Sequence, residues 1–549
     1  MFKNQHRGLY PLALANTGER FGYYIMLATL VLYMQAKFGF DENIAGLYYS
    51  IFLAAVYFMP VVGGWVADKI GFGKCVVTGQ LLMIAGYSCM AIPAMPNTGG
   101  LILMAVALGL ISTGVGFFKG NLVTIFGNLY NSPDYAKGRE SAFSLYYMAN
   151  NIGAMFAPAA ATKVTNVYMA SKGFFYNANV PSLAHQYLNG DINEENLSLL
   201  QEFANAMGFG NNLAAYCQNY IDALSQSFNI GFAIAVLSLI VSAIIYFAFR
   251  PWFKHADYNG KTQSSDEKEL TPKQTRDRII ALCMIFAVII FFWMAFHQNG
   301  TSLTYFARDY TATSVSGWVR MSFNIGVLAI IAVMMFTLFG IFQAETKKGK
   351  TICTIVTLLL ALSIGYIYLN NEGSRDILPQ EFQQFNPFFV IALTPVSLAI
   401  FGSLAKKGKE PSAPMKIAIG MVVAAVGYLI LVMCSIGLPD PSTLNGKTCA
   451  TPVIPEYLIS TYLVLTFAEL LLSPMGLSFV SKVAPPKYKG LMMGLWFASG
   501  AIGNYLSRIP SMLWKEIPLW LNWAILMILC VISAVIMFGL LKKINEATK

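Results

Sequence analysis

The chain has 549 residues, of which 56% are hydrophobic and 12% charged, with a formal net charge of +10. Soluble domains carry roughly 25% charged residues, so this composition excludes an ordinary soluble protein and favours one that crosses a membrane many times. The Lys and Arg residues lie in short loops between apolar stretches, where they set orientation in the bilayer, so the positive charge does not indicate nucleic-acid binding. The spacing of Cys and His fits no metal site, and we expect neither a metal nor another cofactor.

Apolar stretches of about 20 residues, the length that crosses a bilayer, recur along the whole sequence. We predict about fourteen spans, at 10–36, 43–67, 75–93, 100–129, 140–170, 225–249, 277–307, 318–343, 351–369, 386–404, 414–437, 454–481, 490–507 and 518–541. Basic residues fall in alternate loops, and the positive-inside rule places those loops and both termini in the cytoplasm. Cys217 and Cys449 fall in polar segments on the opposite side, which leaves a disulfide between them open.

Two polar segments interrupt this series. Residues 171–224 face the outside in this topology, and their helical periodicity predicts short amphipathic helices. Residues 250–276 form a long charged linker, so we divide the chain into an N-terminal bundle at 1–249, this cytoplasmic linker and a C-terminal bundle at 277–549. The spans at about 318–369 form an extra hairpin beyond two bundles of six helices. Paired bundles are typical of proteins that work by alternating access.

Charged side chains occur inside several predicted spans. Glu19 and Arg20 are neighbours in the first span, Lys119 lies in the fourth and Glu469 in the twelfth. A charge at the centre of a bilayer costs about 2.5–3.5 kcal/mol on insertion scales, so these groups must be paired or face a wet cavity. For Glu19 and Arg20 the alternative is a structural ion pair that joins two helices. Lys119 and Glu469 indicate a functional site, because lone intramembrane charges mark pathways.

A glycine-rich loop follows the second span. Its residues 64–74 resemble the G-x-x-x-D-R/K-x-G-x-R/K signature of the major facilitator superfamily. Glycines there allow close helix contact, and the acidic and basic residues can hold the cytoplasmic ends of helices together. We expect a cytoplasmic latch that consists of Gly64, Asp68, Lys69 and Lys74.

Further segments resemble motifs of the proton-coupled oligopeptide transporter family, in that family's order. Residues 19–24 resemble the motif E-x-x-E-R-F-x-Y-Y, and residues 146–153 resemble F-Y-x-x-I-N-x-G. Residues 385–387 resemble the start of the eighth core helix, and residues 468–478 and 484–496 resemble the block of the tenth and eleventh core helices. The resemblance implies an all-α membrane protein with the major facilitator fold, which imports di- and tripeptides by alternating access. Bacterial members place two extra helices between core helices six and seven. Here the extra pair falls between seven and eight, and we expect it to be peripheral.

A short peptide is a zwitterion, so its site needs an anion for the amine, a cation for the carboxylate and tolerant walls between them. Glu469 is the predicted partner of the amine, and Lys119 and Arg20 are those of the carboxylate. We expect further substrate contacts from Asn151, Asn386, Ser473, Tyr23, Tyr24, Tyr57, Trp293 and Trp496. For each aromatic residue the alternative is ordinary packing against lipid or the core.

Four positions depart from the family pattern. Asn16 replaces the first Glu of its motif, Leu27 an Arg that helps bind the peptide carboxylate, and Ser50 a proton-binding His of animal members. His297 takes the place of an acidic residue in the seventh core helix, and its reference pKa of about 6.5 suits proton binding. We expect His297 to be the main proton-coupling residue, with Glu19 as the next candidate and Glu469 as a further one.

The charges that remain in the predicted site balance. Glu19 and Glu469 stand against Arg20 and Lys119, so no uncompensated charge is buried. Because Asn16 removes one acidic partner, we expect Lys119 to pair with Glu19.

The sequence therefore predicts a monomeric, proton-coupled peptide importer in a bacterial inner membrane, with peptide, protons and lipid as its partners. An uncoupled peptide facilitator, a carrier of another small molecule on the same scaffold, and a receptor without transport remain alternatives. Glu469 argues against nitrate, because an anion gains nothing from a buried carboxylate. We expect no enzyme, because His297 has no nucleophile pattern near it.

Overall fold

The structure, a computed structural model, describes residues 5–177, 179–210, 212–258, 270–299, 301–371, 373–444 and 448–547. Most of this part of the chain is helical. The sheet found in it is one short antiparallel ladder between β1 (Ser314–Val315) and β2 (Arg375–Asp376). The all-α fold class predicted from the sequence is confirmed.

The helices before the linker form the N-terminal half. They are α1 (Leu9–Phe38), α2 (Glu42–Ile70), α3 (Phe72–Ala91), α4 (Thr98–Asn128), α5 (Pro133–Ala136), α6 (Arg139–Ser171), α7 (Val180–Asn189), α8 (Glu194–Ala206) and α9 (Leu213–Ala248). The short helices α7 and α8 lie in the segment for which amphipathic helices are predicted. The linker starts with two short 3-10 turns, η1 (Arg250–Trp252) and η2 (Lys254–Ala256), and its residues 259–269 lie outside the described part.

The helices after the linker form the C-terminal half. They are α10 (Pro272–Phe296), α11 (Ser302–Tyr310), α12 (Gly317–Ser322), α13 (Ile325–Gln343), α14 (Lys347–Leu369), η3 (Pro379–Gln384), α15 (Phe385–Lys406), α16 (Ala413–Ser435), η4 (Pro441–Thr443), α17 (Pro455–Val483), η5 (Pro486–Tyr488), α18 (Lys489–Leu506), α19 (Arg508–Met512) and α20 (Leu519–Ala547).

Two predicted spans in this half are shorter in the structure, because polar side chains end or restart the helix. The span at 277–307 stops at Phe296, where Gln298 turns back and donates to the carbonyl of Met294 at 2.8 Å. The span at 318–343 divides at Asn324, whose side-chain oxygen accepts from the Gly326 and Val327 amides and caps α13.

Eleven helices in the described ranges are long and apolar enough to cross a membrane. Three further helices occupy predicted spans: α1, α6 and α18, with 30, 33 and 18 residues. Their polar side chains lower their hydropathy below that of an ordinary span, although their lengths suit a bilayer. With these three, the described helices match the fourteen predicted spans in order.

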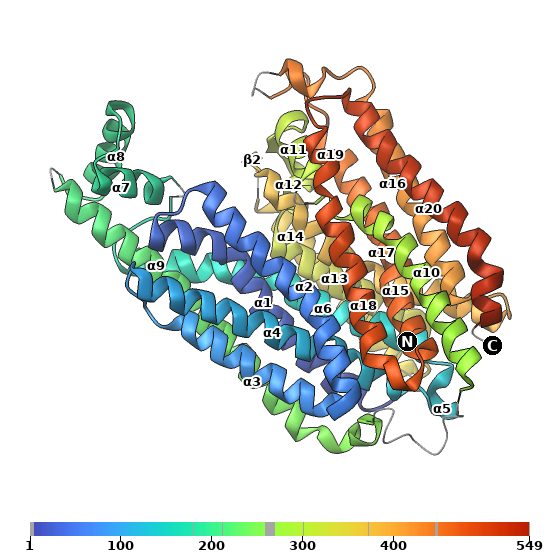
Figure 1. Cartoon of the computed structure of the whole chain (residues 1–549). Coiled ribbons are helices and arrows are strands. Elements are labelled where there is room, and N and C mark those ends of the chain that lie inside the picture. The colour runs from blue at the N-terminus through green and yellow to red at the C-terminus, as the bar shows by residue number, and fades with distance from the viewer. Residues whose placement is uncertain are drawn as a thin grey trace.

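The two halves pack side by side, with the blue-to-green N-terminal half on the left of Figure 1 and the yellow-to-red C-terminal half on the right. Within the first half α1 packs on α6 and α9, and α3 on α4. Within the second, α16 packs on α17 and α20, and α10 on α18. Contacts between the halves come chiefly from α2 with α18 and from α6 with α15 and α17.

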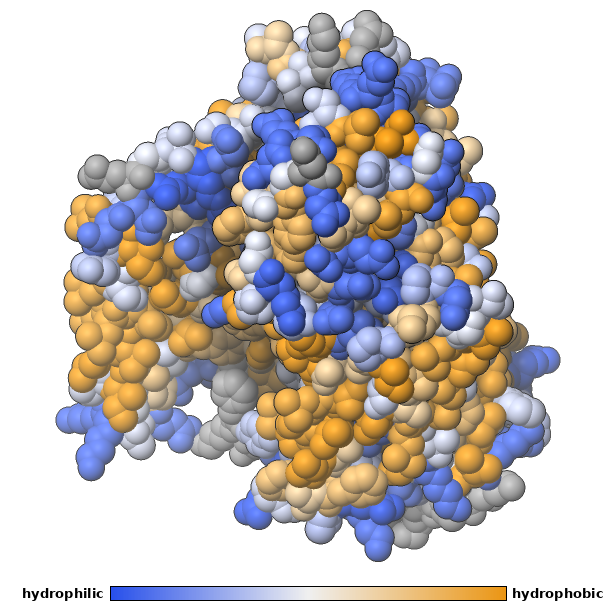
Figure 2. Space-filling view, turned by 90° about the vertical axis from the view of Figure 1, so that its left-hand side faces the viewer, coloured by the Kyte–Doolittle hydropathy of each residue, from blue (hydrophilic) through white to orange (hydrophobic). Residues whose placement is uncertain are grey.

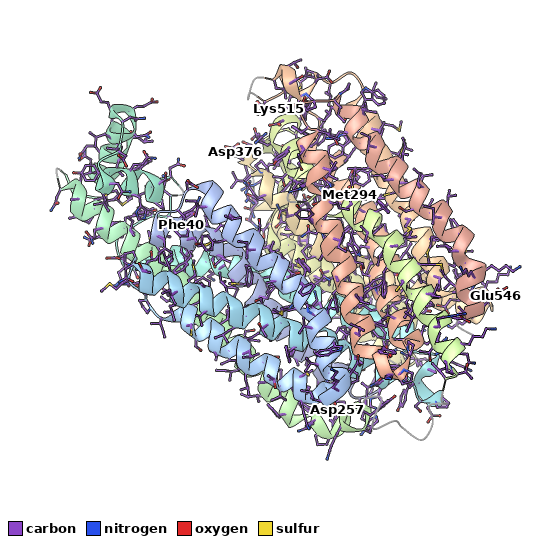
Figure 3. All side chains as sticks on the ribbon, in the orientation of Figure 1. Phe40, Asp257, Met294, Asp376, Lys515 and Glu546 are labelled. Atoms are coloured by element: carbon purple, nitrogen blue, oxygen red, sulfur yellow. The ribbon has the colours of Figure 1, made fainter. Side chains whose placement is uncertain are left out.

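The molecule has two distinct ends. The linker starts at one of them, where Asp257 is labelled in Figure 3, and we name this the linker end. The described N-terminus lies there too, because the Tyr130 hydroxyl donates to Gln5 Oε1 at 2.9 Å. The opposite end, the far end, carries Phe40, Asp376 and Lys515 in Figure 3, together with α7 and α8 in Figure 1.

The extra hairpin consists of α13 and α14, between the seventh and eighth core helices as predicted. Thr357 of α14 donates to Thr337 of α13 at 2.8 Å, so the two helices lie side by side. In the most apolar stretch of α14, 6% of the residues are buried, against 83% in α17. The hairpin is therefore peripheral and α17 central. Figure 2 shows broad apolar areas on the outer surface, between polar regions toward the two ends.

Candidate functional site

Glu469 lies buried in the middle of α17 and receives two hydrogen bonds from neutral groups. Tyr147 of α6 donates to Glu469 Oε1, and the amide of Asn386 on α15 donates to Oε2 at 2.8 Å. Asn386 also donates to Thr466 Oγ1 at 3.1 Å. No Lys, Arg or His among the described residues pairs with this carboxylate. A cationic ligand at this point would compensate its charge.

Glu19 and Arg20 form a closed pair within α1. Arg20 Nε donates to Glu19 Oε2 at 2.5 Å and Arg20 Nη2 to Oε1 at 2.6 Å, so both carboxylate oxygens are engaged. The guanidinium also lies 4.6 Å from the ring centroid of Tyr23, and Tyr24 meets Tyr23 edge to face. A two-pronged Arg–carboxylate bond of this kind is strong. Because both residues belong to one helix, the pair does not join two helices.

Lys119 of α4 lies among aromatic rings. Its ammonium is 4.4 Å from the ring centroid of Phe497 on α18 and 5.8 Å from that of Tyr57 on α2. The expected ion pair with Glu19 is wrong, because that carboxylate pairs with Arg20 and no ion pair joins it to Lys119 in the described structure. Within the described ranges, Lys119 has no acidic partner. Cation–π contacts stabilise such an ammonium without neutralising it.

Asn16, which replaces a family Glu, joins two helices of the first half. Its amide donates to Asn150 Oδ1 on α6, and one residue further Thr17 donates to the Ala149 carbonyl at 2.8 Å. An amide pair thus occupies the position at which the family pattern has a carboxylate. The replacement keeps α1 against α6 and removes a charge from the site.

His297 and Trp293 stack on each other where α10 ends. Their ring centroids are 5.0 Å apart with planes inclined by 19°, and His297 follows the last residue of the helix. The Trp293 indole nitrogen is buried and has no hydrogen-bond partner in the described structure. The ring of Trp496 packs against Gly476 and Phe286, as a core residue does.

Two of the predicted polar site residues make no contact with a charged residue. The Asn151 side chain donates to the Tyr147 carbonyl in its own helix at 3.0 Å. Ser473 lies one turn beyond Glu469 on α17, and its hydroxyl is buried without a partner among the described groups. A ligand or water at this point would satisfy that hydroxyl.

Asp68 links the two halves at the linker end. Its carboxylate accepts from the Gly490 amide at 2.8 Å and the Leu491 amide at 2.9 Å, at the first turn of α18. Amides at a helix N-terminus bind anions in this way. Gly64 and Gly490 lie so close that a Cβ on either would overlap the backbone of the other. Of the predicted latch residues, these contacts involve Gly64 and Asp68.

The two lysines of the predicted latch lie elsewhere. Lys69 lies over the Trp65 ring in its own helix, 3.2 Å from the centroid, and Lys74 is exposed. The structure therefore builds the junction from a carboxylate and backbone amides.

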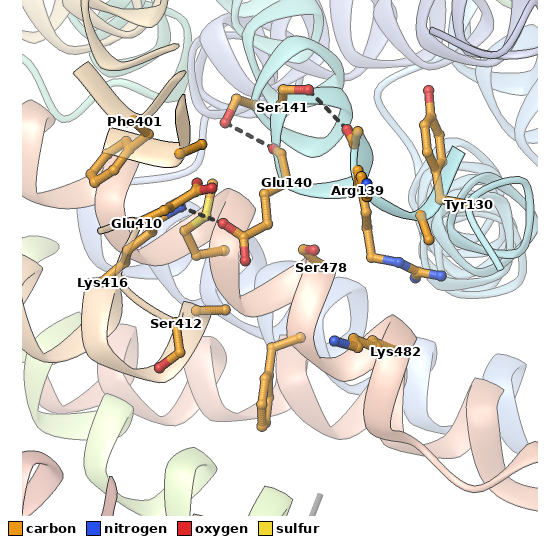
Figure 4. A pocket seen from close by; sticks show the side chains of 18 of the residues that line it. Tyr130, Arg139, Glu140, Ser141, Phe401, Glu410, Ser412, Lys416, Ser478 and Lys482 are labelled. Atoms are coloured by element: carbon orange, nitrogen blue, oxygen red, sulfur yellow. Dashed lines mark hydrogen bonds and ion pairs between the residues drawn. The ribbon is translucent and has the colours of Figure 1, made fainter. Parts of the chain in front are cut away.

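A cavity of about 910 Å³ lies between the halves at the linker end (Figure 4). Met475, Ser478 and Lys482 of α17 line it, the helix that carries Glu469. The first turn of α6 and the start of α16 form two of its other walls. The cavity therefore lies beside the part of α17 that comes after Glu469, toward the linker end.

The sequence reading missed four residues that contact the site. Tyr147 and Thr466 belong to the Glu469 cluster, Phe497 lies under Lys119, and Asn150 pairs with Asn16. Tyr147 and Asn150 stand inside the recognised motif at 146–153, and Phe497 follows Trp496. For Tyr147 and Asn150 the motif was the available signal, but the helix face that each residue would present was not known.

Two halves of membrane-spanning helices, packed side by side with buried charges on both, are typical of transporters of the major facilitator type. A family model described as the POT family matches residues 73–271 and 366–527, about two thirds of the chain. The chain belongs to the POT family, a family of transporters. The stretch between the two matched ranges, 272–365, contains α10, His297, α13 and most of α14.

Curated relatives match over nearly the full length. The uncharacterized transporter YclF of Bacillus subtilis (strain 168) is 27% identical, over 100% of this chain and 96% of its own length. A di-/tripeptide transporter of Lactococcus lactis subsp. lactis (strain IL1403) is 24% identical, over 94% of this chain and 90% of its own length. Dipeptide and tripeptide permease A of Escherichia coli (strain K12) is 24% identical, over 92% of this chain and 85% of its own length.

Solved structures share the fold. The peptide transporter POT in complex with sulfate has a TM-score of 0.51 and 22% identity, over 100% of this chain and 97% of that chain. A POT family transporter in complex with 5-aminolevulinic acid has a TM-score of 0.55 and 19% identity, over 100% of this chain and 98% of that chain.

Proposed function

We propose that this protein is a secondary transporter, and not an enzyme, that imports di- and tripeptides by alternating access. The observation that carries the proposal is the pair of charges without an opposite partner in the described chain, Lys119 on α4 and Glu469 on α17. The helices that carry them contact each other and belong to different halves. One free cation and one free anion are complementary to the carboxylate and amine of a zwitterion.

The neutral groups around these charges suit a peptide. Tyr147 and Asn386 hold the Glu469 carboxylate in place without neutralising it, so an incoming ammonium gains most of the electrostatic attraction. Tyr57 and Phe497 hold Lys119 on the other side. Aromatic walls tolerate different side chains, and specificity comes from the few polar groups that contact the shared termini. The names of the relatives, two of which are peptide transporters or permeases, support the same substrate class.

We infer that transport is coupled to protons through the Glu19–Arg20 pair. Protonation of Glu19 would weaken both hydrogen bonds from Arg20 and leave a buried guanidinium that can bind a carboxylate. Proton and peptide binding would then favour each other, which is the thermodynamic requirement for symport. His297, the first candidate from the sequence, becomes the second one here, because it has no carboxylate partner in the described residues. An uncoupled facilitator is the alternative that a gradient experiment excludes or establishes.

We propose that the linker end faces the cytoplasm of a bacterial cell and that the protein acts as a monomer in the inner membrane. The basic loops at that end support this orientation by the positive-inside rule. Lys482, Lys487 and Lys489 surround the α17–α18 turn. In the opposite orientation these lysines would lie outside.

Competition at the transport step tests the substrate class. Purified protein in liposomes should take up labelled dialanine, and unlabelled dialanine should compete. N-acetyl-dialanine, which lacks the amine charge, and dialanine amide, which lacks the carboxylate, should compete at least tenfold less well, because each leaves one buried charge unpaired. Equal competition by all three compounds would contradict recognition of both termini. Lys119→Gln should abolish the discrimination against the amide and keep that against the acetylated peptide.

A further inference from the structure

The linker-end cavity is closed on one side by a cluster of three charged residues from both halves. Lys416, at the start of α16, has a side chain that is 1% exposed. Its ammonium donates to Glu140 Oε2 from the first turn of α6 and to Glu410 Oε1 at 2.6 Å from the loop before α16. It also lies 4.3 Å from the Phe401 ring centroid. Figure 4 labels these side chains, and a dashed line there joins the ammonium to Glu140.

The two carboxylates differ in what happens to them when the halves separate. Glu140 belongs to the N-terminal half, whereas Lys416 and Glu410 both belong to the C-terminal half. Separation at this end therefore breaks the Lys416–Glu140 pair and leaves Lys416 with Glu410. The Glu140 side chain is already 31% exposed, so water can hydrate its charge as soon as it is released.

We propose that Glu140, Lys416 and Glu410 form a charge clamp that sets the conformational balance of the linker-end gate on the substrate route. The inference rests on the proposed alternating access, because the cavity becomes an exit route only if the halves separate here. Glu140 favours the closed gate. Glu410 keeps the buried ammonium compensated after the gate opens, so that opening does not leave an unpaired charge in the protein.

The two carboxylates should therefore have opposite effects. Removal of the Glu140 charge takes away an attraction that exists only in the closed state, and so favours opening. Removal of the Glu410 charge leaves Glu140 as the carboxylate partner of Lys416, and it also removes the repulsion between the two acids in the closed state. Opening of that variant would leave the ammonium uncompensated, so the closed state is favoured. A purely structural ion cluster would make both substitutions loosen the same contact.

Other contacts close this end too, so the clamp biases the gate and does not hold it alone. Asp68 binds the start of α18, and Arg139 beside Glu140 donates to Ser481 Oγ on α17 at 3.0 Å. In neither of these contacts does a second carboxylate bind the same partner, as Glu410 does at Lys416. They should therefore remain in variants of the clamp and keep the fold intact.

Distance measurements by double electron–electron resonance test the proposal on full-length protein in liposomes without substrate. Spin labels at Lys74 of α3 and Lys543 of α20, both exposed at the linker end, would report its opening in a background without the eight native cysteines. Glu140→Gln should raise the open-to-closed ratio by about fivefold or more, and Glu410→Gln should lower it by a similar factor. Glu140→Asp, which keeps the charge, should stay near the parent protein.

Glu381→Gln is the matched control, because it breaks the Arg375–Glu381 pair at 2.7 Å within the C-terminal half at the far end. It should leave the distances unchanged. Shifts of the two clamp variants in the same direction, or no shift in either, would overturn the proposal. The readout does not depend on the substrate: opposite shifts without dialanine uptake by the parent would refute the peptide proposal and leave the clamp standing.

Discussion

Tyr147 of α6 donates a hydrogen bond to the Glu469 carboxylate of α17, so the two halves of the molecule meet at the charge that we assign to the peptide amine. A ligand that binds Glu469 therefore binds at a junction between the halves. A change in the charge of that carboxylate alters a hydrogen bond that joins the two halves. Substrate binding and relative movement of the halves can be coupled at this one contact.

Glu469→Gln should abolish binding of unmodified peptides. Loss of one partner of a desolvated charge pair costs about 2–5 kcal/mol, which corresponds to a fall in affinity of roughly 30-fold or more. Calorimetric titration of purified protein with dialanine measures the change. The far-end variant Glu381→Gln removes an acid outside the site and should bind as the parent does. Normal binding by Glu469→Gln would show that another group holds the amine.

Glu19→Gln should separate exchange from accumulation. The substitution removes the protonatable group and releases Arg20 permanently, so dialanine should still exchange across the membrane but no longer follow a gradient. One charge moving through 100 mV yields about 2.3 kcal/mol, or roughly fifty-fold accumulation, for a coupled carrier. Uptake into polarised liposomes of parent, Glu19→Gln and His297→Gln proteins measures it.

The comparison of these two variants decides where the proton binds. Accumulation that survives in Glu19→Gln and is lost in His297→Gln would show that the coupled proton binds at His297. If the parent itself brings dialanine only to equal concentrations, the protein is a facilitator and coupling at either residue is wrong.

Asp68→Asn should weaken the closed state of the linker end. The neutral amide keeps the size of the carboxylate but loses the charge that the Gly490 and Leu491 amides bind, and hydrogen bonds to charged groups contribute about 1.5–3 kcal/mol. A cysteine at Ser478, which lines the linker-end cavity and is buried, should become reactive toward a thiol reagent. Lys74→Gln is the control, since Lys74 is exposed and makes no contact at this junction. Equal protection of Ser478→Cys with and without Asp68→Asn would argue against a role of this contact in closure.

The spans and the motif residues could be predicted from the sequence because both are local signals. An apolar stretch of about 20 residues, or a charge inside it, needs no partner to be recognised. The hairpin of α13 and α14 was predicted on the same ground, and the structure confirms its place in the chain.

Partners distant in the sequence could not be predicted. Glu140 and Lys416 are 276 positions apart, and each lies at the start of a predicted span, where a charge is ordinary. The wrong expectation of a Lys119–Glu19 pair has the same origin. A charge count balances without saying which acid each base contacts, and in the structure Glu19 pairs with Arg20. Phe497 was missed because its orientation toward Lys119 depends on how α18 lies against α4.

Labelling of single cysteines in intact cells should establish the orientation. A cysteine at Asn193, at the start of α8, should react with an impermeant thiol reagent from outside, whereas cysteines at Lys348 and Lys407 should be protected. Protection is also expected at Ser264, which lies outside the described residues. External labelling at Lys348 would show that α13 and α14 do not cross the membrane as a hairpin.

Counterflow of labelled dialanine tests the central claim most directly, because it needs neither a proton gradient nor knowledge of the coupling residue. Liposomes that contain purified protein and a high internal concentration of unlabelled dialanine are diluted into trace labelled dialanine. The expected result is a transient accumulation of label above its external concentration, absent in Glu469→Gln and unaffected in Glu381→Gln. A parent protein that gives no transient accumulation, although it is folded and correctly inserted, would contradict the assignment of this molecule as a peptide carrier.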